Sequence, residues 1–94
     1  MTAYMIAEMD VTDAAAYEAY KAAASEIITR YGGRYVARGG PSACLEGEPA
    51  KRVVIVAFDS IEAAQRWYRS DEYQAARQLR ANAAHGRLFV VEGL

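Results

Sequence analysis

The chain has 94 residues, of which 53% are hydrophobic and 24% charged, and its formal net charge is −1. This composition indicates one small globular domain over residues 1–94 and excludes a disordered chain. The near-zero charge provides no basic face for nucleic acid, and no apolar run approaches the length of a membrane span. With one cysteine and no recognisable secretory leader, we expect a cytoplasmic protein.

The first part of the chain predicts a strand, a helix and a second strand. Residues 3–9 are short and apolar, and the Thr-Asp pair at 12–13 can cap a helix expected over 13–31. Apolar residues recur in that helix at steps of three and four. The Gly-Gly pair at 32–33 ends it, because glycine accepts the left-handed backbone of a C-terminal cap. The second strand is expected over 34–38.

The second part begins with a long irregular loop over 39–51, rich in glycine and proline, with a short hairpin piece expected around Cys44-Leu45-Glu46. Residues 52–58 are β-branched and apolar throughout, which predicts a buried strand. A helix is expected over 59–83, opened by a capping box at Asp59 and broken near its middle. The last strand is expected over 86–93.

The resulting order, β-α-β-β-α-β, predicts an α+β fold: a ferredoxin-like sandwich with a four-stranded antiparallel sheet and helices on one face. Two helices cover only one face of such a sheet, yet the strands at 52–58 and 86–93 are apolar on both faces. An uncovered apolar face needs a partner. We therefore expect a homodimer in which two copies pack sheet to sheet.

Several segments resemble the domain of unknown function family 1330, which belongs to the dimeric α/β-barrel superfamily. The resemblance covers essentially the whole chain and rests on "AYMIAEMDVTDAAAYEAY", "GGRYVARGG", "LEGE", "RVVIVAFDSIEAAQRWYRSDEYQAAR" and "VVEG". It implies a ferredoxin-like protomer and a dimer whose sheets face one another. It brings no established reaction, because the superfamily includes cofactor-free monooxygenases, haem-degrading enzymes, isomerases and proteins of no known activity, and a shared fold does not choose among them.

The segment "WYRSDEY", residues 67–73, is the densest aromatic stretch of the chain. Ser70 can cap a new helical turn, which predicts a kink between two helical pieces. In one interpretation Trp67 and Tyr73 pack against the sheet and the kink is purely structural. In the other, Trp67, Tyr68 and Tyr73 wall a pocket, and Arg77, four residues after Tyr73, holds an anion.

A second candidate site combines Arg38 with Glu8. Strand alternation places Arg34, Val36 and Arg38 on one face, and Glu8 near the same end of the sheet. If both side chains point between the two sheets of a dimer, Glu8 can act as a general base and Arg38 can hold an anionic oxygen. The alternative is an ion pair that sets strand register or protects a sheet edge.

The remaining candidates are weaker. Tyr17 and Tyr20 lie on the packed face of the first helix and are expected to be core, although the hydroxyl of one of them can reach a pocket as a donor. Glu46, in the long loop, is a second acid–base candidate or a solvated acid. One histidine, His85, cannot make a metal site, and Cys44 has no histidine beside it to activate it.

We therefore expect binding of a small organic acid or similar metabolite in a cavity, without metal or cofactor and with or without cofactor-free chemistry. In this interpretation Arg38 anchors the ligand and the residues of 67–73 form walls. The alternative is a non-catalytic structural or interaction protein with no small-molecule site. A third hypothesis is haem handling, in which His85 would be the single axial ligand.

Overall fold

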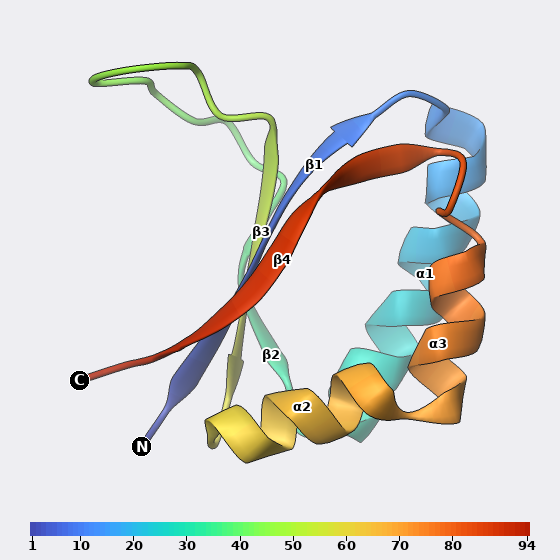
Figure 1. Ribbon diagram of the computed structural model, residues 1–94, viewed down its shortest axis with the longest axis vertical. Helices are drawn as coiled ribbons and strands as arrows, with labels where there is room; N and C mark the ends of the chain where they lie inside the picture. Colours follow the sequence, from blue (N-terminus) through green and yellow to red (C-terminus); the bar gives the residue numbers. More distant parts are fainter.

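The computed structural model describes residues 1–94 (Figure 1). Its seven elements follow the order that the sequence predicts, with the second helical region divided into two helices. In chain order they are β1 (Ala3–Val11), α1 (Ala14–Arg30), β2 (Arg34–Arg38), β3 (Arg52–Phe58), α2 (Ile61–Arg69), α3 (Asp71–Gln78) and β4 (Ala84–Glu92).

The four strands form one antiparallel sheet in the order β2-β3-β1-β4. All three helices lie on the same side of this sheet (Figure 1). The predicted α+β, ferredoxin-like architecture is confirmed, and the sheet of the single chain is open rather than closed on itself. No helix is both long enough and apolar enough to cross a membrane.

The core lies between the helices and the face of the sheet that they cover. Alternate residues of β1 are buried from Ala3 to Met9, because successive side chains of a strand point to opposite faces. Val56 and Phe58 of β3 meet Trp67 of α2 and Tyr73 of α3, and all four are completely buried. These large side chains define where the helices dock.

The opposite face of the sheet, here called the open face, is also apolar. Ile6 of β1 lies directly between Ile55 of β3 and Phe89 of β4, and Tyr4 lies beside Val91 in the next row. Phe89 and Val91 are 41% and 47% exposed, and no helix packs on this face of the sheet. An uncovered apolar sheet face of this kind is typical of a protein–protein contact surface.

Side-chain caps set the helix boundaries. Asp13 caps α1 by accepting from the backbone N–H of Ala16 at 3.1 Å, as predicted. The cap of α2 differs from the prediction, since Ser60 and not Asp59 accepts the N–H of Ala63 at 3.0 Å. A serine hydroxyl one residue later fills the same role, so the helix begins at residue 61.

Ser70 produces the predicted kink between α2 and α3. Its hydroxyl donates to the carbonyl of Trp67 at 2.7 Å and accepts from the N–H of Tyr73 at 3.1 Å. One side chain thus ends one helix and begins the next. Helix α3 ends at Gln78, before the predicted residue 83, and turns lead from there to the start of β4.

A bulge in β2 changes the predicted faces of that strand. Tyr35 pairs with Val56 and Ala37 pairs with Ile55, so one extra residue stands between them. Simple alternation placed Arg34 and Arg38 on the same face. The bulge instead moves Arg38 to the helix-covered face, where its β3 partner is the buried Val54.

The loop over 39–51 extends away from the sheet as a long arm (Figure 1). It contains no strand, so the hairpin piece expected around Cys44-Leu45-Glu46 is absent, and the chain bends at Gly39 and at 46–48. Every residue of the loop is exposed, including Leu45 at 91%. Without packing against the domain, the short apolar piece has no partner strand to pair with.

Candidate functional site

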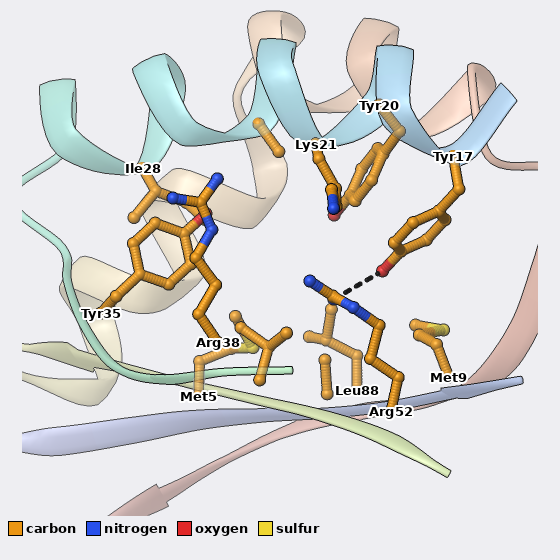
Figure 2. A pocket seen from close by; sticks show the side chains of 13 residues that line it. Met5, Met9, Tyr17, Tyr20, Lys21, Ile28, Tyr35, Arg38, Arg52 and Leu88 are labelled. Atoms are coloured by element: carbon orange, nitrogen blue, oxygen red, sulfur yellow. Dashed lines mark hydrogen bonds between the residues drawn. The ribbon is translucent and has the colours of Figure 1, made fainter. Parts of the chain in front are cut away.

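A small cavity lies between α1 and the helix-covered face of the sheet; we call it the α1 cavity. Its volume is about 30 Å³, which is space for roughly two water molecules. Figure 2 shows side chains from α1 and from the strands meeting around it. It is lined by Met5, Ala7, Met9, Tyr17, Tyr20, Lys21, Ala24, Ile28, Tyr35, Arg38, Arg52, Val54 and Leu88.

Three cationic side chains from three different elements reach this cavity. Lys21 comes from α1, Arg38 from the end of β2 and Arg52 from the start of β3 (Figure 2). No carboxylate is among the lining residues, and the floor is made by methionine and aliphatic side chains. A mostly apolar hollow with a few convergent polar groups is the usual form of a small-molecule site.

Arg38 is held at the mouth of the cavity by two contacts. Its guanidinium lies over the ring of Tyr35, 4.4 Å from the centroid. It also donates to the hydroxyl of Ser25 on α1. A planar guanidinium stacked on an aromatic ring keeps its other N–H groups available for an anion. Arg38 itself is exposed, so its side chain has room to move outward.

Arg52 is held on the opposite side of the cavity by Tyr17. Its guanidinium donates to the Tyr17 hydroxyl at 3.3 Å and lies 5.2 Å from the centre of that ring. Tyr17 is 5% exposed, as expected for the packed face of the first helix, and its hydroxyl end reaches the cavity. The two arginines therefore stand on either side of the same space (Figure 2).

Lys21 is the third cation, and it also pairs with an acid outside the cavity. Its ammonium lies 2.8 Å from the carboxylate of Glu18 on the same helix. The hydrogen bond and charge of Lys21 lower the pKa of Glu18, and the charges of Arg52 and Arg38 lower it further. All three cations therefore lie close enough to the Glu18 carboxylate to lower its pKa.

Tyr20 connects the cavity to the interior behind it. Its hydroxyl lies 2.9 Å from that of Tyr73, which in turn accepts from Arg80 at 3.3 Å. Burial raises the pKa of Tyr20 far above its usual value. Tyr20 is therefore protonated at any ordinary pH and acts as a neutral hydrogen-bonding group rather than a base.

The aromatic segment 67–73 lies elsewhere. Trp67 and Tyr73 are completely buried, with ring centres 4.3 Å apart, and neither is an exposed wall of the α1 cavity. Tyr68 is half-buried and borders a second hollow of about 380 Å³ between α2 and β4. Arg77 lies 6.0 Å from the centre of the Tyr68 ring. No cation other than Arg69 borders this second hollow, whose other lining residues are mostly apolar.

The structure separates Glu8 and Glu46 from the cavity. Glu8 lies on the open face, where it accepts from the backbone N–H of Lys51 at 3.3 Å and lies 3.6 Å from Arg87. The bulge in β2 places Arg38 on the other side of the sheet, so the expected Glu8–Arg38 pair does not form. Glu46 is exposed in the arm.

The single histidine is exposed and stands apart from every cavity side chain named above. His85, near the start of β4, lies 3.8 Å from the carboxylate of Asp10 in β1. No cluster of three or more histidine, cysteine, aspartate or glutamate side chains is arranged to hold a metal ion.

Lys21 and Arg52 are lining residues that the sequence analysis did not select. Alternation through β3 would have found Arg52, because it shares a face with the buried Val54 and Val56. Lys21 follows Tyr17 by four residues, and such pairs lie on one helix face. The structure places Lys21, which is half-buried, at the border of the packed face of α1.

The sequence model of the family described as "Domain of unknown function (DUF1330)" matches residues 2–94. The chain therefore belongs to this family. No protein with a curated description matches the sequence.

Solved structures share the fold. A protein of unknown function from Rhodopseudomonas palustris superposes with a TM-score of 0.80 at 25% identity, covering 99% of this chain and 82% of that one. A dimeric, ferredoxin-like protein of unknown function from Bacteroides fragilis gives a TM-score of 0.68 at 13% identity, with coverages of 98% and 96%. An ethyl tert-butyl ether d (EthD) family protein from Bacillus halodurans gives 0.59 at 14%, with coverages of 100% and 99%.

Proposed function

We propose that this member of the DUF1330 family binds a small organic anion, a compact carboxylate, in the α1 cavity. The observation that carries the proposal is the convergence of Lys21, Arg38 and Arg52 on an apolar hollow that no carboxylate lines. A guanidinium presents a fork of N–H donors that matches the two oxygens of a carboxylate. The apolar floor suits the short hydrocarbon part of such a ligand.

The size of the cavity limits the ligand. A volume of about 30 Å³ holds about two water molecules, so a carboxylate of a few heavy atoms fits only when a rim side chain moves aside. Arg38 is the side chain free to move, since it is exposed and is held by one ring and one hydroxyl. The proposal concerns binding and assigns no chemical step to Glu8 or Glu46.

Acetate is a suitable probe, because it is the smallest carboxylate with an apolar group. We expect NMR titration of the ¹⁵N-labelled protein with sodium acetate, at constant ionic strength, to shift the signals of α1 and of Arg38. Arg38→Gln removes a charge-assisted hydrogen bond and should weaken binding at least about tenfold. Arg66→Gln, on the exposed face of α2, is the matched control and should bind as the wild type does.

Two results would overturn the proposal: shifts that avoid the α1 cavity, or an Arg38→Gln variant that binds acetate as tightly as the control. Absence of any binding would favour the alternative function, a structural or interaction protein in which the arginines and tyrosines only hold the helix layer on the sheet.

We also propose that two copies associate through their open faces. Supporting this are the row of Ile55, Ile6 and Phe89, the exposed Val91 beside it, and the dimeric state of the Bacteroides fragilis neighbour. A pair of such faces buries apolar surface that water otherwise contacts. The arm over 39–51 lies on the same side of the sheet as the open face (Figure 1), so it would flank the second copy.

Light scattering coupled to size exclusion measures this directly. We expect a mass of twice 10.3 kDa at micromolar concentration. Phe89→Glu puts a charge into the proposed contact and should give a monomer, whereas Glu62→Lys, on the exposed side of α2, should leave the dimer intact. A wild-type monomer, or a Phe89→Glu dimer, would show that the open face is not the contact.

A further inference from the structure

A chain of hydrogen bonds leads from the surface turn after α3 to the α1 cavity. Arg80 donates to the Tyr73 hydroxyl at 3.3 Å, and the oxygens of Tyr73 and Tyr20 are 2.9 Å apart. Tyr20 borders the cavity, whereas Tyr73 is completely buried behind it. The three residues come from α1, α3 and the turn beyond, so only the folded chain brings them together.

The direction of these hydrogen bonds can be worked out from the groups involved. Arginine has donors and no acceptor, so the oxygen of Tyr73 accepts from Arg80. The proton of Tyr73 is fully buried and needs an acceptor, and the Tyr20 oxygen is its hydrogen-bond partner in the structure. In the reverse arrangement the Tyr73 proton would be buried without a partner, which costs about 1–3 kcal/mol.

If Tyr73 donates to Tyr20, the proton of Tyr20 is free to point elsewhere. We infer that the Tyr20 hydroxyl donates a hydrogen bond to the anion in the α1 cavity, and that Tyr73 and Arg80 are positioning residues that direct its proton there. The Arg80 guanidinium makes the Tyr20 hydroxyl a stronger donor, because each donated hydrogen bond polarises the next hydroxyl along the chain. This inference rests on the proposed function for the identity of the ligand, but not for the orientation of the proton.

Tyr17 shows the same arrangement on the other side of the cavity. Its oxygen accepts from Arg52 at 3.3 Å, and its own proton donates no hydrogen bond to another protein group. The polar lining of the cavity is therefore rich in donors: one lysine, two arginines and the hydroxyls of Tyr17, Tyr20 and Tyr35. Such a lining favours a head group that only accepts hydrogen bonds, a carboxylate, over an amide of the same shape, whose NH₂ group meets three cations and no carboxylate.

Proton orientation can be measured without any ligand. With tyrosine carrying ¹³C at the ζ carbon, NMR in a mixture of H₂O and D₂O gives two lines for a hydroxyl that exchanges slowly and one line for a hydroxyl that exchanges fast. We expect two lines for Tyr73, whose proton is sealed in, and one for Tyr20, whose proton faces the cavity. Tyr20→Phe and Tyr73→Phe assign the signals. The opposite pattern would overturn the inference.

Acetate binding then tests the role of the proton with a matched pair of variants. Tyr20→Phe and Tyr73→Phe remove the same hydrogen bond, but only Tyr20→Phe removes the hydroxyl that faces the cavity. We expect acetate affinity to fall about tenfold in Tyr20→Phe and less than threefold in Tyr73→Phe. We expect acetamide to bind the wild type at least tenfold more weakly than acetate does.

Equal losses in the two variants would mean that Tyr20 acts only through packing, and the inference would fail while the proposed function stood. If the wild type does not bind acetate at all, the proposed function fails. In that case the exchange measurement alone decides whether the proton faces the cavity.

Discussion

Two clusters of aromatic side chains in this molecule are similar in composition but differ in how they pack. Trp67, Tyr68 and Tyr73 at the α2–α3 kink pack against each other and the sheet, with ring centres 4.3–6.0 Å apart. The tyrosines of the α1 cavity stand around an unfilled space, because each is held at its hydroxyl end by an arginine or a second hydroxyl.

A high density of aromatic residues is therefore not enough to mark a binding site. The kink group is larger and more conspicuous in the sequence, yet Trp67 and Tyr73 are completely buried. The feature that distinguishes the cavity is charge: Arg38 and Arg52 cannot be buried without partners, so they stay at its rim and keep it open to water. We expect substitutions in the two groups to affect different properties, stability in one and binding in the other.

The largest effect is expected for Trp67→Ala. Removing a completely buried indole leaves a void next to Phe58 and Tyr73 and should lower the free energy of unfolding by about 3–5 kcal/mol. Urea denaturation followed by circular dichroism measures this. Arg38→Gln, at the cavity rim, should change stability by less than about 0.5 kcal/mol. Comparable losses in both variants would contradict the division between a packed group and an open one.

A pH effect of intermediate size is expected from Tyr20. The pKa of its hydroxyl is raised in the folded protein above the ordinary 10.0, so the unfolded chain loses this proton first as pH rises. The contribution of Tyr20 to the free energy of unfolding is fully present below about pH 10. It is lost above that pH, at up to about 1.4 kcal/mol per pH unit for one proton.

Urea denaturation of the wild type and of Tyr20→Phe between pH 9 and pH 11 measures this contribution. Above about pH 10 the free energy of unfolding should fall less steeply with pH in Tyr20→Phe. The difference in slope should correspond to nearly one proton. Identical slopes in the two proteins would show that folding does not raise the pKa of Tyr20.

Ser70→Ala tests the junction between α2 and α3, inside the kink group. Loss of the hydroxyl removes the cap of α3 and the bond to Trp67, and should lower the free energy of unfolding by about 1 kcal/mol. Acetate binding in the α1 cavity should be unchanged, because Ser70 touches none of its lining. Ser42→Ala in the exposed arm is the control and should have no effect on either quantity.

Most of the fold follows from local patterns in the sequence. Alternation and β-branched residues located β2 and β3 at their observed bounds, and the expected β1 and β4 differ from the observed strands by about two residues. Asp13 and Ser70 cap the helices that local patterns assigned to them. These features follow from contacts between residues close in the chain, whose signals survive in a single sequence.

The candidate site depended on tertiary structure. Arg38 reaches the cavity only because a bulge in β2 reverses the face on which it lies, and local alternation contains no sign of that extra residue. Tyr20 meets Tyr73 across 53 residues of chain. Lys21, Arg38 and Arg52 converge because helix α1 crosses the sheet over the ends of β2 and β3 (Figure 2). The positions of side chains from separate elements are set by how the layers pack, and only the folded chain contains that information.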